Sequence, residues 1–291
     1  MMIPRRLDQI LTKKPVLRLS IIGDGLQRLG EHVAGLAASI ETLQARDDIR
    51  GAAALDVICT EEAAKVLILL DMARDIYSQK VGQISAKSFY NHLARSIYAQ
   101  VHGSNPADYR EIVRQVKDHR ESHYLDGPND ADWGFRNDLQ RQRDTALYVD
   151  YEENEPGQFS WSGGNPELVN VSAMITPLVL SMREVGMLTE AGARATAEVW
   201  KISKFDESTR WEYCQLKALD VVRSVLPEHE EEARGLRGHT VTVTQKWTFP
   251  LTGLDLSLIV RPREVMQEKQ AAHLNQMMMD EYGPSMTGDY R

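Results

Sequence analysis

The sequence contains little cysteine, and it lacks a long apolar run. Its two cysteines, Cys59 and Cys214, form no CxxC or Cys/His spacing, which argues against a disulfide framework and against a zinc site. No uninterrupted apolar stretch approaches the roughly 20 residues of a membrane span, and the basic N-terminal segment lacks the apolar core of a signal peptide. We therefore expect a cytoplasmic globular protein that does not associate with a membrane.

Positive charge is in the minority. The chain has 34 Lys and Arg against 42 Asp and Glu, so its net charge of -8 provides no overall attraction to nucleic acid. Between residues 80 and 143, however, ten Lys or Arg stand against eight Asp or Glu, and four of the eight histidines are found there. A basic surface is therefore expected to be local and to lie in this region.

The common short motifs of nucleotide and metal sites are also missing. GxxxxGK[ST], GxGxxG, HExxH and EF-hand patterns are absent, and no histidine has a glutamate three residues before it, as the di-iron carboxylate bundles require. We expect no cofactor and no metal. Acid–base chemistry by side chains remains, in which histidine moves a proton and arginine stabilises a phosphate.

Most of the sequence has the periodicity of apolar residues that is typical of helices. In residues 51–74, GAAALDVICTEEAAKVLILLDMAR, apolar residues occur on every side of the predicted helix, which is typical of the core helix of a bundle. An amphipathic helix predicted over residues 26–43 would pair with it as an antiparallel hairpin. We expect a mainly α fold with further helices over residues 85–101, from residue 106, and over residues 131–149, 167–187, 190–202 and 207–225.

The pattern changes after residue 237. In TVTVTQKWTF and LDLSLIV, apolar residues alternate with polar ones, which predicts a C-terminal β-hairpin, and residues 262–282 can form one more helix. We therefore expect a helical domain over residues 1–235 and an extension over residues 236–291. The hairpin should pack on the helices or pair across a dimer, because a lone hairpin is only marginally stable.

Three charged residues interrupt the predicted core helix. Glu61 and Glu62 lie four and three residues before Lys65, so both carboxylates are within reach of one ammonium group on a helical face. Buried charges cost free energy unless they are paired. Two interpretations remain open: an internal salt bridge along a partly wet seam, or a polar site lined by this helix.

Histidine and arginine recur together twice. On the third predicted helix, His92, Arg95 and His102 share the face opposite the apolar stripe, although a solvated helix face often carries such residues by chance. Arg95 and His102 lie within about 20° of each other on a continuous helix, whereas Arg114 and His119 would lie about 140° apart and need a helix end or distortion to meet. Either pair has the groups needed to cleave RNA through its own 2′-hydroxyl.

Three segments, in order, resemble the AbiV-type abortive-infection proteins, a branch of the HEPN superfamily in bacterial antiviral defence. DIRGAAALDVICTEEAAKVLILLDMAR resembles the family's helix of small residues, EE-x-x-K and aliphatics. NHLAR is similar to its histidine followed three residues later by a basic residue, and RDTALYVDYEENEPGQFSW to its ALYVD…W segment. The resemblance covers roughly residues 26–185, with a departure at Ala63 and Ala64, where the family prefers a bulkier residue and a glycine.

This resemblance implies an HEPN-like helical bundle that commonly dimerises, and a role in stopping phage growth at the expense of the infected cell. Many HEPN proteins are metal-independent ribonucleases with an Arg-x(4–6)-His motif, while others are not catalytic. We expect RNA, such as tRNA or mRNA, as the substrate. The expected catalytic residues are Arg95, His102, His92, Glu62 and Lys65, with Arg114 and His119 as second choice, and the expected RNA-binding residues are Arg143, Arg136 and Lys117.

Two other functions stay open. A non-catalytic defence effector would use the bundle to bind a phage protein or the translation machinery, with the charged residues as a structural network and the Trp161 loop and the C-terminal hairpin as the contact surface. An antitoxin-like partner of a nucleotidyltransferase is the third. In each case we expect a homodimer, because pairing two copies brings two local basic surfaces into one cleft. A phage-encoded trigger or a regulatory protein is a further expected partner.

Overall fold

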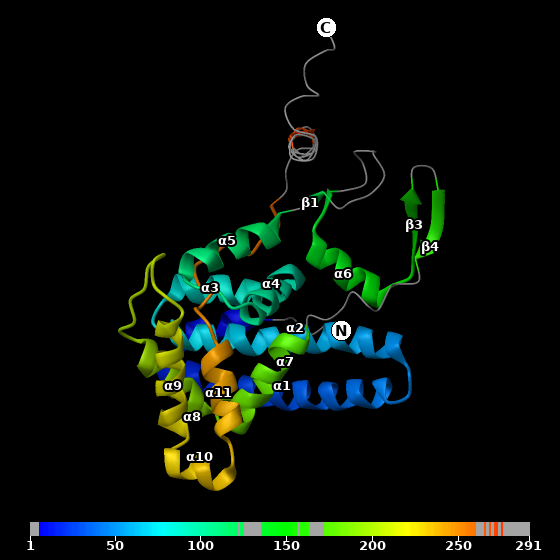
Figure 1. Ribbon diagram of the computed structural model, residues 1–291. Coiled ribbons are helices and arrows are strands. Elements are labelled where there is room, and N and C mark those ends of the chain that lie inside the picture. Colours follow the sequence, from blue (N-terminus) through cyan, green and yellow to red (C-terminus); the bar gives the residue numbers. More distant parts are fainter. Residues whose placement is uncertain are drawn as a thin grey trace.

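The computed structural model describes residues 6–121, 123–124, 135–155, 158–162 and 172–259, and the helical residues 265, 268, 271, 272 and 275. Helices form most of it, and two short two-stranded sheets are added (Figure 1). Its elements in chain order are η1 (Leu7–Thr12), α1 (Pro15–Gln44), α2 (Ile49–Arg74), α3 (Gln79–Ser88), α4 (His92–Gly103), α5 (Tyr109–Arg120), β1 (His123–Tyr124), β2 (Phe135–Arg136), α6 (Asp138–Leu147), β3 (Asp150–Glu155), β4 (Gln158–Ser162), α7 (Ser172–Glu184), α8 (Glu190–Trp200), α9 (Glu212–Val225), α10 (Glu228–Arg234) and α11 (Arg237–Lys246).

Helix α2 is the core helix that the sequence predicts. Asp48 caps its start, where the Gly51 amide donates to Asp48 Oδ1 at 2.9 Å. From Cys59 onward its side chains are almost all buried, because α1, α4, α7 and α8 pack on different sides of it. Burying one leucine completely contributes about 1.5–3 kcal/mol, so this helix supplies much of the hydrophobic stabilisation. The prediction of a mainly α fold is confirmed.

Helix α1 runs along α2 and completes the predicted opening hairpin of helices (Figure 1). It begins earlier than expected, with Pro15 in its first turn, where the missing amide hydrogen costs nothing. Its buried residues recur at helical spacing from Leu19 to Ile40. Gly23 allows close contact with α8, because a Cβ atom there would lie 2.5 Å from Glu190 Cα.

The third predicted helix is in fact two helices, so the expectation of one continuous helix over residues 85–101 was wrong. Asn91 has extended backbone angles (φ -95°, ψ 121°), and its side chain accepts a hydrogen bond from the Ala94 amide at 2.9 Å. An asparagine in this conformation caps a new helix, since its side-chain oxygen satisfies an amide that has no partner in the first turn. His92 therefore becomes the first residue of α4.

The predicted C-terminal β-hairpin was wrong. Residues 237–246 form α11, which packs on α7 and α9. Leu236, Thr240, Val243 and Trp247 follow one another at spacings of four, three and four residues, and all four are buried. The same stretch of Val and Thr thus contains a helical face as well as an alternating one, and packing against the body selects the helix over β propensity.

Strands occur instead between residues 123 and 162, outside the C-terminal third where we expected them. β3 pairs antiparallel with β4, with Tyr151 opposite Trp161, in a stretch predicted to be a loop. β1 pairs with β2, which places Arg136 opposite His123 in the backbone register. Tyr151, Phe159 and Trp161 alternate with polar residues on either side of the sequence Pro156-Gly157, which is a hairpin signal that the prediction of a loop did not use.

The chain after α11 continues into the same hydrophobic core. Phe249 and Leu251 are buried within it, together with residues of α2. The division into domains at residue 235 stays a prediction, and most of the helix predicted over residues 262–282 lies outside the described residues. In the part of the chain that the structure describes, no helix combines the length and apolar character needed to cross a membrane.

Candidate functional site

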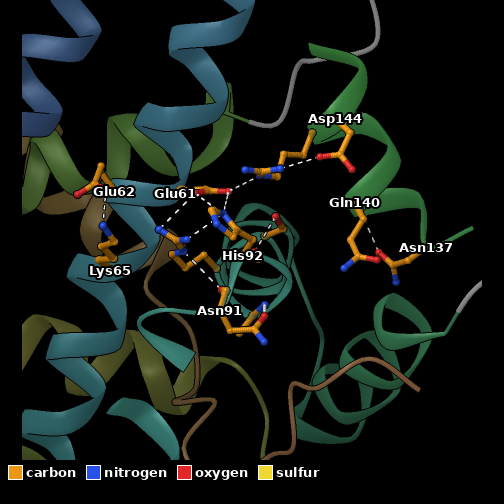
Figure 2. A network of polar contacts seen from close by, with 12 residues as sticks. Glu61, Glu62, Lys65, Asn91, His92, Asn137, Gln140 and Asp144 are labelled. Carbon is orange, nitrogen blue, oxygen red and sulfur yellow. Dashed lines mark hydrogen bonds and ion pairs between the residues drawn. The ribbon is translucent and has the colours of Figure 1, made fainter. Parts of the chain in front are cut away.

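Glu61 lies on α2 where α4 and α6 approach it, and its carboxylate holds three basic side chains (Figure 2). His92 Nδ1 is 2.8 Å from Oε1 and 2.9 Å from Oε2 of Glu61. Arg95 Nη1 is 3.2 Å from Oε2, and Arg143 Nε is 3.0 Å from Oε1. We call these four residues the Glu61 cluster.

Helix caps place the basic members of the cluster. Asn91 starts α4, so that His92 and Arg95 both lie in its first turn, next to α2. Asn137 starts α6 in the same way, accepting from the Gln140 amide at 3.2 Å. The Asn137 side chain also donates to the backbone oxygen of His119 at 2.7 Å, which ties the start of α6 to the end of α5. The two caps therefore fix the helices that carry the arginines.

The members of the cluster differ in exposure. The Glu61 and Arg95 side chains are 10% and 7% exposed and that of Arg143 is 19% exposed, whereas His92 is 52% exposed. Burial lowers the pKa of Arg143, but Glu61 and then Asp144 raise it more, so the net shift is upward and the guanidinium stays charged. Arg143 also pairs with Asp144, Nη1 to Oδ1 at 2.6 Å, so two carboxylates balance the two guanidinium groups, and the site offers a phosphate individual arginines rather than a net positive charge.

The hydrogen bonds of Glu61 determine which nitrogen of His92 is basic. An ionised carboxylate only accepts hydrogen bonds, so Nδ1 of His92 must carry the proton that it shares with Glu61. Arg95 Nη2 lies 2.9 Å from the same nitrogen, but a protonated Nδ1 cannot also accept, and Arg95 is held by Glu61 instead. In the neutral ring Nε2 is then the nitrogen that can take up a proton.

A small groove, partly open to solvent, lies beside the cluster. Of the cluster, Glu61 and Arg143 line this groove, and His92 lies one turn before the lining residue Ser96 on the same face of α4. Among the described residues, no group of three or more His, Cys, Asp or Glu is arranged to hold a metal ion. The groove is lined by Val57, Thr60, Glu61, Ser96, Gln100, Leu139, Gln142 and Arg143.

The charged trio of α2 separates into two sites. Lys65 forms a close ion pair with Glu62, and Figure 2 shows this pair apart from Glu61, which turns toward His92. Lys65 Nζ also lies 5.4 Å from the ring centroid of Phe89. The side chains of Glu62 and Lys65 are 16% and 17% exposed, in agreement with a partly wet salt bridge. Glu61 is bound to α4 and α6 instead.

His102 is fully buried, so the expectation that it lies on an accessible face of α4 was wrong. Its Nδ1 donates to the backbone oxygen of Tyr98 at 3.0 Å, and its ring stacks on that of Tyr98 at a centroid distance of 5.8 Å. Burial, and then the charge of Arg74, lower the pKa of His102 to about 3. A histidine in this state stays neutral near pH 7, which contradicts its predicted role in proton transfer.

Arg114 and His119, the second-choice catalytic pair, do not come together in one site either. Helix α5 is continuous from Tyr109 to Arg120, so Arg114 and His119 keep the separation of about 140° expected on one helix. Arg114 is 70% exposed and lies 3.8 Å from Glu111. Lys117 is exposed on the same helix, and the side chain of Arg136 lies outside the described residues. Of the three predicted RNA-binding residues, the structure brings Arg143 into the Glu61 cluster.

The comparisons with known proteins identify the class. A family model of the HEPN group, described as AbiV, matches residues 22–169, which is just over half of the chain. The chain therefore belongs to the AbiV family of HEPN proteins, among the proteins of abortive-infection defence. No curated protein and no solved structure matches it.

The three segments that carried the resemblance meet at Glu61. EE-x-x-K supplies Glu61, NHLAR supplies His92 and Arg95, and the ALYVD segment begins at Arg143. Sequence reasoning left Glu61 open between a salt bridge and a polar site, did not count it among the catalytic residues, and placed Arg143 in RNA binding alone. The order of the segments was a usable signal, because residues from separate matching motifs often form one site.

Proposed function

We propose that this protein stops phage growth by cleaving RNA, as a metal-independent endoribonuclease centred on the Glu61 cluster. The observation that carries this proposal is the convergence of His92, Arg95 and Arg143 on one carboxylate beside an open groove. A proton acceptor and two phosphate-binding cations are the groups that RNA transesterification needs. The HEPN membership adds an analogy of fold, which raises the expectation but does not replace the site.

In the proposed reaction, the 2′-hydroxyl oxygen of RNA attacks the adjacent phosphorus, and Nε2 of His92 takes the hydroxyl proton. The 5′-oxygen leaves with a proton from water, which gives a 2′,3′-cyclic phosphate and a 5′-hydroxyl end. Arg143 and Arg95 stabilise the added negative charge on the phosphoryl oxygens. Glu61 acts as a positioning residue that keeps Nδ1 of His92 protonated and the ring in place.

We also propose that the active form is a cytoplasmic homodimer that a phage-encoded or regulatory protein controls. The net charge of -8 repels RNA overall, so the arginines of two copies facing one cleft would bind a phosphate backbone better than those of one copy. Light scattering at micromolar concentration measures the oligomeric state. A monomer would contradict the shared cleft without deciding whether a single copy cleaves RNA.

The test is incubation of the purified protein with total RNA and with tRNA in the presence of EDTA. We expect fragments with 2′,3′-cyclic phosphate ends, and we expect His92→Ala to lower the cleavage rate by about 10² to 10⁴. His32→Ala is the matched control, because His32 is an exposed histidine on α1, and it should cleave like the wild type. Cleavage by His92→Ala at the wild-type rate would contradict the proposal.

The alternative is a defence protein that acts by binding alone. The exposed aromatic hairpin of β3 and β4 favours it, since such surfaces are typical of protein contacts. Under this alternative the Glu61 cluster is a structural network. Intact phage protection by His92→Ala, together with no cleavage by the wild type, would establish this binding role.

A further inference from the structure

The β3–β4 hairpin exposes three aromatic side chains on one face. Tyr151, Phe159 and Trp161 are 59%, 53% and 71% exposed. The ring centroid of Tyr151 lies 5.2 Å from that of Trp161 and 5.8 Å from that of Phe159. Tyr151 is opposite Trp161 in the register, and Phe159 precedes Trp161 by two residues, so the three rings share a face of the sheet.

This face has no cover from the rest of the described chain. Figure 1 shows the hairpin apart from the helical body, beyond α6, and among the described elements each of its strands packs closely only on the other. A two-stranded hairpin is marginally stable in water. Exposed Tyr and Trp side chains gathered in one place are the residue types that dominate the binding energy of protein interfaces.

The charge of the hairpin indicates what it binds. The sequence has no Lys or Arg from residue 144 to residue 182, while Asp150, Glu152, Glu153 and Glu155 all belong to β3. Surfaces that stack the bases of single-stranded RNA combine aromatic rings with a positively charged groove, and this hairpin has the opposite charge. Arginine and lysine, by contrast, are attracted both to aromatic faces and to carboxylates.

We propose that the exposed face of Tyr151, Phe159 and Trp161 binds an arginine- or lysine-rich segment of a partner protein. The cationic side chains lie over the rings, and the acidic sequence of the hairpin favours a positively charged partner. The proposal does not depend on RNA cleavage, because neither the rings nor the strands belong to the Glu61 cluster.

The test is fluorescence anisotropy of the full chain with a labelled deca-arginine peptide and with a labelled decauridylate, at a salt concentration of about 0.15 M. We expect the peptide to bind, and Trp161→Ala and Tyr151→Ala each to weaken its binding at least tenfold. The matched control is Tyr77→Ala, because Tyr77 is 60% exposed elsewhere on the surface, and it should bind like the wild type. The melting temperature of the helical body should change little, because these rings stabilise a hairpin whose strands pack closely only on each other among the described elements.

Three outcomes would overturn the proposal. Equal peptide binding by Trp161→Ala and the wild type would mean that the peptide binds to acidic surface elsewhere. Binding of decauridylate that Trp161→Ala abolishes would assign the aromatic face to RNA. A dimer that Trp161→Ala converts to a monomer in light scattering would assign the face to a second copy of this chain.

Discussion

Helix α2 carries two clusters of charge that differ in their access to solvent. The Glu61 cluster lies beside the groove and exposes half of the His92 side chain. Ten residues further along, Asp71 is the centre of a second cluster, the Asp71 cluster, formed with Arg74, Tyr98 and His102. All four of its side chains are buried.

The chain that follows α11 closes the Asp71 cluster. The Arg74 guanidinium lies 4.2 Å from the ring centroid of Trp200 and 4.0 Å from that of Trp247, and it donates to the Thr248 backbone oxygen at 3.0 Å. The Leu251 amide donates to Asp71 Oδ2 at 2.9 Å. Nothing equivalent covers the Glu61 cluster among the described residues. The two pairings of carboxylate and arginine thus differ in that the C-terminal chain closes over the Asp71 cluster, whereas a groove lies beside the Glu61 cluster.

The largest effect is expected from breaking the closed cluster. In Arg74→Met, Asp71 would remain buried without its cation, and loss of one partner of a buried ion pair costs about 3–5 kcal/mol. Urea denaturation measures this loss of unfolding free energy. Arg28→Met is the control, because Arg28 forms an exposed pair with Asp24, and its midpoint should stay close to that of the wild type. A stable Arg74→Met variant would show that the cluster does not secure the C-terminal chain.

The pH dependence of stability sharpens the comparison. An unfolded chain protonates His102 below its ordinary pKa of 6.5, whereas burial keeps the folded residue neutral down to about 3. The unfolded state therefore binds more protons in this window, and the His102 contribution to stability is lost as the pH falls from 6.5. Asp71 acts in the opposite direction, because burial raises its pKa to about 6 and the folded state gains protons first.

A His102→Leu variant isolates the histidine contribution, since Asp71 and all other groups remain. Between pH 6.5 and about 5, we expect the wild type to lose stability relative to this variant by up to about 1.4 kcal/mol for each pH unit. Urea denaturation across this range measures the difference. The control is His32→Leu, because His32 is exposed, and its unfolding free energy should depend on pH as that of the wild type does. If the unfolding free energies of His102→Leu and the wild type changed equally with pH, His102 would not be held neutral in the folded protein.

Sequence patterns predicted the core helix and the segments of the site, but not how the site is assembled. Helix α2 is apolar on every side, so it can only be buried in the centre of the bundle. Glu61 and Glu62 are adjacent and so point about 100° apart, and only the positions of α4 and α6 determine which of them meets a histidine. His102 was misplaced for a related reason: α4 has a second buried side, which the periodicity of one helix cannot reveal when a polar residue occupies it.

The two hairpin errors have a common physical cause. Residues 237–246 contain Val and Thr, which favour strands in isolation, but their contacts with α7 and α9 stabilise a helix. Residues 150–162 contain many polar residues and looked like a loop, but cross-strand aromatic pairs stabilise strands there. In both cases neighbours distant in sequence, or across a turn, decided the structure.

The smallest effect is expected at Glu62, whose side chain is 16% exposed and pairs with Lys65. Sequence reasoning counted this pair among the expected catalytic residues. In the structure the pair is partly wet, and Glu62→Gln keeps a hydrogen-bond acceptor for Lys65, so we expect a loss of about 1 kcal/mol or less. Its cleavage rate should stay within about twofold of the wild type, since surface changes away from a site have small effects.

Glu61→Gln is the matched variant with which Glu62→Gln has to be compared. A neutral amide would remove the Glu61 carboxylate from both Arg95 and Arg143, while Arg143 keeps Asp144, so the variant should lose both stability and cleavage. The two glutamates are adjacent on α2. A difference in stability or cleavage between the two variants therefore results from the partners of each carboxylate and not from its position along the helix. Equal losses of cleavage in both variants would return Glu62 and Lys65 to the site and contradict the separation of the two carboxylates.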